Sequence, residues 1–180
     1  MGSEMCIRDR NKPTVVSDGM WLLPAAVWNR EPFLSELADE RYSNVIASYD
    51  AGRSFARRGY AIIPERTYDE HMIVELKDKR LWMLVRTKYG IGQSFSFDGG
   101  FTWSPGEPTS LGGPNSRFFI RRLNSGRLLL VNHWKFSGRS HLTALFSEDE
   151  GKTWQEGLLL DEREWVSYPD GVQCEDGRIY

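Results

Sequence analysis

The amino-acid sequence predicts an all-β protein built from repeated four-stranded antiparallel sheets. Three observations lead to this prediction. An eight-residue turn pattern recurs at intervals of about 50 residues, which is the range of repeats in solenoids and propellers. A strand–turn–strand pattern recurs in step with it. In the two clearest pairs, the second strand (residues 81–85 and 128–131) is a continuous apolar run, which is typical of a strand buried on both faces.

The turn pattern is S-x-D-x-G-x-[ST]-[WF], and its copies begin at Ser48, Ser96 and Ser147. Its aspartate can accept backbone N–H bonds within a tight turn, and its glycine adopts a positive φ without steric cost. Its aromatic residue buries a large flat surface against a neighbouring sheet. The pattern therefore predicts architecture rather than catalysis. The residues expected in these structural roles are Asp50, Gly52, Asp98, Gly100, Trp103, Asp149, Gly151 and Trp154.

The strand–turn–strand pattern is clearest at residues 73–85 and 120–131, begins again at 172–180, and has a weaker first copy at 15–23. Together with the turns, it defines a unit of about 50 residues with four strands, A to D. A tight turn joins A to B, a longer loop joins B to C, and the aspartate turn joins C to D. Sheets stacked around an axis as propeller blades bury both faces. The alternative is a β-sandwich with coincidentally similar turns, which the regular spacing disfavours.

The units are expected near residues 11–60, 67–110, 115–160 and 165–180, the last being truncated. Residues 1–10 fit none of this patterning and contain no apolar segment of the kind a secretory signal needs. We interpret them as a non-native leader. The sequence therefore predicts about three and a half blades after that leader.

Composition and charge argue against several classes of function. The formal net charge is −2, so there is no basic field to attract nucleic acid. No apolar run approaches the roughly 18 residues of a membrane-spanning helix. Cys6 and Cys174 show neither metal-ligand spacing nor a disulfide framework. We expect no nucleic-acid partner, no membrane span, no metal and no cofactor.

The three turn copies resemble the Asp-boxes of sialidases, which are also called bacterial neuraminidase repeats. The segment 167–171, followed by 176–180, is similar to a late blade of non-viral sialidase-like proteins. The resemblance covers roughly residues 12–180. It implies a six-bladed β-propeller, a glycan or sialylated glycoconjugate as substrate, and a secreted or periplasmic location. Asp-boxes are specific for this fold but weak evidence of activity, because many propellers that are not sialidases carry them.

A functional site is expected at the end of the sheets that the repeated turns do not occupy. In a four-stranded meander, the A–B and C–D turns share one end, and the B–C loops and D–A connections share the other. We align the repeats on Arg80, Arg127 and Arg178 to find which residues occupy equivalent positions at this second end. The start of strand A carries Glu70, Arg117 and Tyr168, the end of strand B carries Arg86 and His133, and beside them lie Asp69, His71, Asn115, Trp134 and Asp170.

These residue types suit a glycosidase that acts on an acidic sugar. Arginine matches a carboxylate in a planar, bidentate geometry, so Arg86 and Arg117 are candidate anchors. Sialidases use a tyrosine nucleophile instead of the usual pair of carboxylates. By that resemblance Tyr168 is the candidate nucleophile. Its base would be Glu70 or Asp170, and the general acid would be Asp69 or Asp170. His71, His133, Asn115 and Trp134 are further candidates for substrate binding.

Each candidate also has a structural alternative. Glu70 and Asp69 could cap an exposed loop, and Arg117 could pair with a carboxylate at a blade edge. Tyr168 precedes Pro169, which favours an extended, well-packed start to a strand. The histidines could belong to loops or strand edges.

The sequence also departs from the family pattern. The Arg-Ile-Pro motif that carries the first arginine of the sialidase triad is absent, and Arg10, which aligns with Glu70, lies in the suspected leader. Two other functions therefore stay open. One is a polysaccharide lyase that uses His71 or His133 beside Tyr168. The other is a non-catalytic glycan-binding propeller in which aromatics such as Trp134 stack on sugars.

Overall fold

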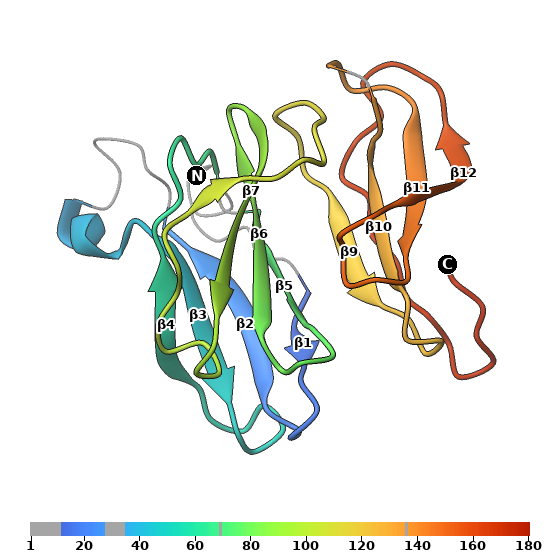
Figure 1. Cartoon of the computed structure of the whole chain (residues 1–180). Coiled ribbons are helices and arrows are strands. Elements are labelled where there is room, and N and C mark those ends of the chain that lie inside the picture. The colour runs from blue at the N-terminus through green and yellow to red at the C-terminus, as the bar shows by residue number, and fades with distance from the viewer. Residues whose placement is uncertain (1–11, 28–34, 69, 136) are drawn as a thin grey trace, which may run out of the picture. The chain divides into compact units, whose positions relative to one another are not determined.

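The computed structural model describes residues 12–27, 35–68, 70–135 and 137–180, and it shows three four-stranded antiparallel sheets (Figure 1). The first sheet contains β1 (Thr14–Val15), β2 (Trp21–Ala26), β3 (Ser43–Ser48) and β4 (Ala56–Ala61). The second contains β5 (Met72–Glu75), β6 (Leu81–Thr87), β7 (Gly90–Ser96) and β8 (Glu107–Pro108). The third contains β9 (Phe119–Arg122), β10 (Leu128–His133), β11 (Leu142–Ser147) and β12 (Gln155–Asp161). The predicted fold class, a partial propeller of four-stranded antiparallel sheets, is confirmed.

The chain divides into two compact units, which are described separately below. The first unit is Met1–Thr109 and holds two of the sheets, and the second unit is Ser110–Tyr180 and holds the third. The second unit also contains the start of another hairpin, marked by an isolated bridge between Gln173 and Ile179. Each predicted unit near 11–60, 67–110 and 115–160 contains one sheet, whereas the division of the chain into blade domains stays a prediction. The suspected leader at 1–10 lies outside the described residues.

The A–B turns are alike in all four repeats. The same backbone bond, from the N–H at the end of strand A to the carbonyl that precedes strand B, closes every turn. It joins Val16 to Met20, Leu76 to Arg80, Leu123 to Arg127 and Cys174 to Arg178, with N···O distances of 2.8–2.9 Å. Arg80, Arg127 and Arg178 therefore occupy equivalent positions in their turns, as the sequence alignment of the repeats predicted.

The C–D turns are organised by their aspartates. In the second sheet, the carboxylate of Asp98 accepts bonds from the hydroxyls of Ser96 and Thr102 and from the backbone N–H groups of Phe101 and Thr102. The N–H of Gly100 donates to the Ser96 hydroxyl at 2.8 Å. Asp50 and Asp149 make the corresponding bonds with Ser48 and Ser54, and with Ser147 and Thr153. Local hydrogen bonds thus fix the shape of each turn.

In the second and third sheets the second strand is completely buried, as predicted, whereas β2 of the first sheet alternates between buried and half-buried residues. Every residue of β6 and of β10 is buried. In the first unit, side chains of both sheets form one apolar core. Its members are Val16, Met20, Leu22, Val45, Ala47, Ala61, Ile63, Ile73, Leu81, Met83 and Val85. Trp103, the aromatic of the second aspartate turn, packs against this core.

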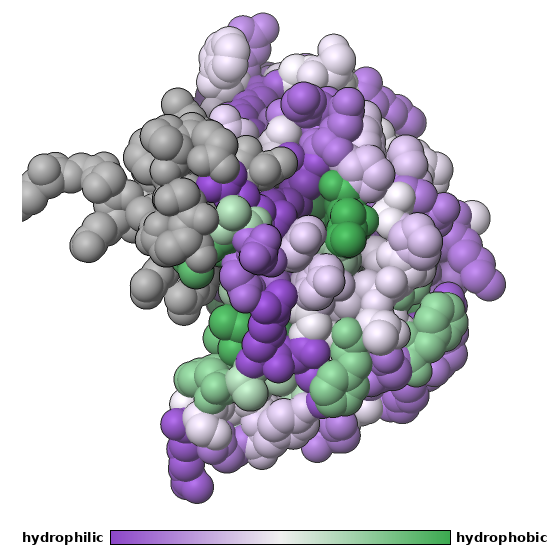
Figure 2. Space-filling model, turned by 90° about the vertical axis from the view of Figure 1, so that its left-hand side faces the viewer, coloured by the Kyte–Doolittle hydropathy of each residue, from purple (hydrophilic) through white to green (hydrophobic). Residues whose placement is uncertain are grey.

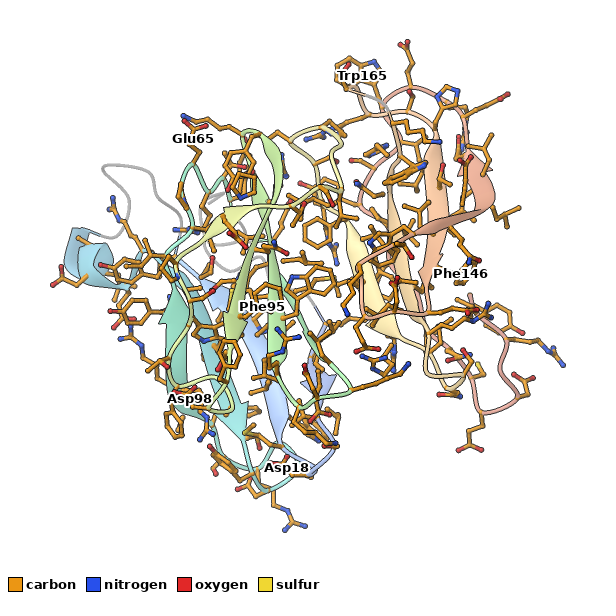
Figure 3. All side chains as sticks on the ribbon, viewed as in Figure 1. Asp18, Glu65, Phe95, Asp98, Phe146 and Trp165 are labelled. Carbon is orange, nitrogen blue, oxygen red and sulfur yellow. The ribbon has the colours of Figure 1, made fainter. Side chains whose placement is uncertain are left out.

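Turns and loops occupy opposite ends of each sheet. In the first unit, Asp18 and Asp50 line one shared pocket, so the A–B and C–D turns of the first sheet meet there. Figure 3 shows Asp18 and Asp98 at this end and Glu65 at the opposite end of the unit. A short helix, η1 (Ser35–Glu40), lies in the B–C connection of the first sheet, where only a loop was predicted.

An equivalent side-chain clamp ties neighbouring A–B turns together within each unit. The backbone N–H of Ser17 donates to the carboxylate of Glu75 at 2.9 Å. In the second unit the backbone N–H of Asn124 donates to the side-chain oxygen of Gln173 at 2.8 Å. The repeat alignment places Ser17 with Asn124 and Glu75 with Gln173. Such clamps join consecutive repeats, which cannot bury their faces alone.

The surface in Figure 2 is mainly hydrophilic, and its apolar side chains form small separate patches. Exposed apolar residues scattered in this way are normal for a folded domain. In the described ranges, no helix has the length and apolar character needed to cross a membrane.

Candidate functional site

A buried ion pair lies at the loop end of the first unit. Arg86, near the end of β6, places Nη1 at 2.5 Å from Oε2 of Glu70, just before β5. The side chains are 4% and 3% exposed, so neither charge is screened by bulk water. Extending the β5–β6 register, in which Met72 faces Leu84, places these two residues opposite each other. Glu70 thus holds the guanidinium that the sequence proposed as a substrate anchor.

Two further features of the Glu70–Arg86 pair describe how its charged groups are surrounded. The Oε1 atom of Glu70 is buried and has no hydrogen-bond partner among the described residues. The guanidinium of Arg86 also lies 4.4 Å from the ring centre of Tyr68, a residue that is 46% exposed. A cation stacked on an aromatic face is stabilised by the ring quadrupole. Sequence reasoning missed Tyr68, although an aromatic residue two positions before Glu70 was a visible signal.

Arg66 fixes the segment that carries Tyr68 and Glu70. Its Nη1 donates to the carbonyl of Tyr68 at 2.9 Å. Its Nη2 donates to the carbonyls of Val27 and Arg41, at 3.0 and 2.9 Å, which flank the B–C connection of the first sheet. One rigid guanidinium fork therefore joins the D–A connection to the base of this loop. This role of Arg66 could not be predicted, because backbone carbonyl acceptors leave no pattern in residue types.

His71 is a structural residue in this arrangement. Its imidazole is fully buried, and Nε2 lies 2.9 Å from the carbonyl oxygen of Asn44, so Nε2 is the protonated donor nitrogen. Burial is the main cause that lowers the pKa of His71 to about 4. The His71 side chain has no exposed surface in this structure, and its role in substrate binding stays a prediction.

In the second unit, Arg117 and Tyr168 lie side by side. The guanidinium of Arg117 is 5.8 Å from the ring centre of Tyr168, and the tyrosine is 49% exposed. The backbone of Tyr168 has a φ of +65°, and the residue after it, Pro169, is buried. The alternative of an extended, well-packed Tyr168 is therefore wrong. A left-handed backbone at this position is compatible with an accessible phenol.

Asp170 lies two residues after this tyrosine and is exposed. Its Oδ1 accepts the backbone N–H of Gly171 at 2.8 Å. This bond restricts the orientation of the carboxylate without burying it. An exposed phenol, a guanidinium and an exposed carboxylate are thus carried by two short segments of one unit.

His133 and its neighbours support the same end of the second unit. The His133 ring is fully buried, with Nδ1 at 3.0 Å from the carbonyl oxygen of Ser140 and Nε2 at 3.4 Å from the Ser116 hydroxyl. The Nδ1–H therefore donates to the carbonyl, and the hydroxyl donates to Nε2. Burial is the main cause that lowers the pKa of His133. Like that of His71, the predicted role of His133 in substrate binding stays a prediction.

Asn115 and Trp134 each lie beside a basic side chain near the loop end of the second unit. The carbonyl of Asn115 accepts a bond from Nη2 of Arg139 at 3.3 Å. Trp134 is half-buried, and the Lys135 ammonium lies 5.7 Å from its ring centre. Substrate binding by either side chain stays a prediction. Asp69, the candidate general acid, lies outside the described residues.

The structure thus brings Glu70 and Arg86 together in the first unit, and Arg117 and Tyr168 together in the second. Within the residues that the structure covers, no group of three or more histidine, cysteine, aspartate or glutamate side chains could hold a metal ion. The arrangement in each unit relies on carboxylates, guanidinium groups and a phenol.

Comparisons with known proteins agree with this architecture. The family model described as a BNR repeat-like domain matches residues 9–180. None of the curated proteins matches the sequence significantly. A Hadza microbial sialidase is similar with a TM-score of 0.67 and 22% identity over 84% of this chain and 30% of its own. The intramolecular trans-sialidase from Ruminococcus gnavus is similar with a TM-score of 0.63 and 20% identity over 94% of this chain and 37% of its own.

A glycosidase with another substrate is also similar. The α-L-arabinofuranosidase from Fusarium graminearum matches with a TM-score of 0.57 and 16% identity over 92% of this chain and 51% of its own. The chain therefore spans between about a third and a half of the length of these proteins. At such identities the likeness shows the fold, which is that of glycoside hydrolase propellers, and leaves the substrate to be argued from the residues.

Proposed function

The chain belongs to the BNR repeat-like domain family, and we propose that it is part of an exo-glycoside hydrolase that releases a terminal acidic sugar, sialic acid, from glycoconjugates. The observation that carries the proposal is the pairing of Arg117 with the exposed ring of Tyr168, whose centre lies 5.8 Å from the guanidinium. A guanidinium attracts a sugar carboxylate, and a phenol beside it is placed to attack the neighbouring anomeric carbon.

Charge explains why a phenol suits this position. A sugar that carries a carboxylate next to its anomeric carbon repels an anionic nucleophile, whereas a neutral phenol approaches without that repulsion. Sialidases are the glycosidases known to use tyrosine in place of a carboxylate. In the proposed mechanism the phenol oxygen of Tyr168 attacks the anomeric carbon, and its proton passes to a carboxylate. Asp170 is the candidate acceptor within the same unit.

The remaining roles follow from carboxyl chemistry. A protonated carboxyl group donates a proton to the leaving oxygen. Asp69 or Asp170 is proposed for this step. Glu70, whose Oε2 lies 2.5 Å from Nη1 of Arg86 in the first unit, is kept as the alternative candidate base.

The burial of both histidines favours a hydrolase over a lyase. A lyase needs a base within hydrogen-bond reach of the sugar proton that it removes. His71 and His133 are each fully buried and bonded to backbone carbonyls. Neither imidazole is accessible to a polysaccharide in this structure.

Product analysis with the full-length gene product tests the proposal. We expect free sialic acid from 3′-sialyllactose, loss of that product in Tyr168→Phe, and no change in Tyr49→Phe. Tyr49 is a matched control because it is 63% exposed and lies at the turn end of the first unit. An unsaturated uronate product from a uronate polysaccharide, without sialic acid release, would overturn the proposal in favour of a lyase. Glycan binding without any product would overturn it in favour of a binding propeller.

A further inference from the structure

The most exposed large apolar side chain among the described residues is Trp165, with 81% of its surface accessible. It lies in the connection that follows β12, at the loop end of the second unit (Figure 3). The position is three residues before Tyr168. An indole ring offers a large flat apolar face together with an N–H group at its edge, which suits an accessible tryptophan to contact a ligand.

The backbone at Trp165 is fixed even though its side chain is exposed. Its φ is +67°, in the left-handed region, and its N–H donates to the carbonyl of Arg139 at 2.6 Å. The guanidinium of Arg139 in turn donates to the carbonyl of Asn115 at 3.3 Å. The connection is therefore tied to the B–C loop of the same sheet and to the segment that leads to Arg117.

Two other exposed aromatics, Phe97 and Phe101, differ because their rings already carry intramolecular cations. In the first unit, the Arg58 guanidinium lies 3.4 Å from the ring centre of Phe101, and the Arg80 guanidinium lies 5.7 Å from that of Phe97. Trp134, the aromatic that the sequence put forward for sugar stacking, has the Lys135 ammonium 5.7 Å from its ring centre. Over the described part of the chain, no such cation or ring contact is recorded for Trp165.

We propose that Trp165 is a stacking platform for a neutral sugar on the leaving-group side of the terminal acidic sugar. The proposal rests on the proposed function, because Arg117 and Tyr168 hold the acidic sugar in that account. Sugar rings present apolar C–H faces that cover an aromatic ring, as in other mostly apolar sites that use a few polar groups for orientation. A neutral partner fits because the neighbouring cation, Arg163, is already paired with Asp161 at 2.6 Å.

The position of Trp165 in the chain suits this role. A terminal sugar at Tyr168 has its leaving group directed away from the attacking phenol oxygen, and the next sugar occupies adjoining surface. The platform would give the enzyme a preference for oligosaccharides over acidic sugars attached to groups that cannot stack. It acts on binding and specificity, and it takes no part in proton transfer.

Binding calorimetry on the full-length gene product tests the platform. The probes are a thio-linked sialyl-lactose that resists hydrolysis, free sialic acid and lactose. We expect Trp165→Ala to weaken binding of the thio-linked compound about tenfold, since a stacked aromatic contact is worth about this much. Binding of free sialic acid should stay within about twofold of the unmodified protein. Trp165→Phe should retain most of the affinity, and Phe97→Ala, which removes a 75% exposed ring from the turn end, should change neither affinity.

Equal weakening for the thio-linked compound and for free sialic acid, or no weakening for either, would overturn the platform. If the unmodified protein binds no sialic acid at all, the proposed function fails while the platform can still be judged. Lactose binding that is lost in Trp165→Ala then supports a neutral-sugar platform. Lactose binding that is absent, or that is independent of Trp165, overturns it.

Discussion

The carboxylate of Glu70 and the guanidinium of Arg86 form a 2.5 Å ion pair in which both side chains are almost completely buried. Removing one partner leaves an uncompensated buried charge, which costs about 3–5 kcal/mol of folding stability. We expect Glu70→Leu and Arg86→Met each to lower the free energy of unfolding by about this amount. The double variant should recover much of the loss, because it removes both charges. Denaturant titration of the three variants measures these differences.

An exposed pair provides the control for this prediction. Glu40 and Arg57 are also 2.5 Å apart, but their side chains are 37% and 44% exposed. Glu40→Gln should therefore change the free energy of unfolding by less than about 1 kcal/mol. Equal losses of unfolding free energy for the Glu40 and Glu70 variants would contradict the prediction that the buried pair contributes more to stability than the exposed pair.

The aspartates of the C–D turns predict a loss of stability in acid. Hydrogen bonds, chiefly from the serine or threonine hydroxyl four residues later, lower the pKa of Asp50, Asp98 and Asp149 to about 2. The unfolded chain has a pKa near 3.9 for these groups, so it binds protons first as the pH falls. The free energy of unfolding should therefore decline between about pH 4 and pH 2. Asp98→Asn should flatten that decline, which denaturant titration at a series of pH values measures.

The buried imidazole of His71 predicts a second window at higher pH. Its pKa is about 4 in the folded protein, below the ordinary value of 6.5, because burial disfavours the charged ring. Only the unfolded chain therefore gains this proton between about pH 6.5 and pH 4. His71 alone should make the free energy of unfolding fall by at most about 1.4 kcal/mol for each unit that the pH decreases in this window, and the lowered pKa of His133 acts in the same direction. An NMR titration that gives His71 a pKa near 6.5 would contradict the described burial.

The clamp between neighbouring A–B turns predicts which substitutions Glu75 tolerates. Gln173 occupies the aligned position and accepts the corresponding backbone N–H with an amide oxygen. Glu75→Gln should therefore keep the bond to Ser17, while Glu75→Leu loses it and costs roughly 1 kcal/mol. Thermal unfolding of both variants distinguishes them. Equal shifts in the midpoint would mean that the side-chain acceptor does not matter there.

The fold could be predicted because its determinants are local. The Asp98 turn is closed by side chains that lie within four residues of Asp98, so its residue types alone identify the turn. The apolar run 128–131 likewise predicts a strand buried on both faces, and β10 is completely buried. Such signals recur in each repeat, and agreement among the repeats also fixed the alignment of strands A and B.

The details of the site were harder to predict, because they depend on contacts between segments. The sequence placed Glu70 and Arg86 at the same end but missed that they neutralise each other, although an antiparallel register puts them opposite. It also could not show that His71 is buried or that Arg66 binds three backbone carbonyls. These outcomes depend on packing between segments and on backbone acceptors, which residue types do not reveal.

Covalent trapping of the nucleophile tests the central claim most directly. The full-length gene product would be incubated with a fluorinated sialosyl fluoride, which slows breakdown of a glycosyl-enzyme intermediate, and its peptides would be mapped by mass spectrometry. The account predicts a sialosyl adduct on Tyr168 that is absent in Tyr168→Phe and weaker in Arg117→Ala. An adduct on a different residue, or sialic acid release that persists in Tyr168→Phe, would contradict it.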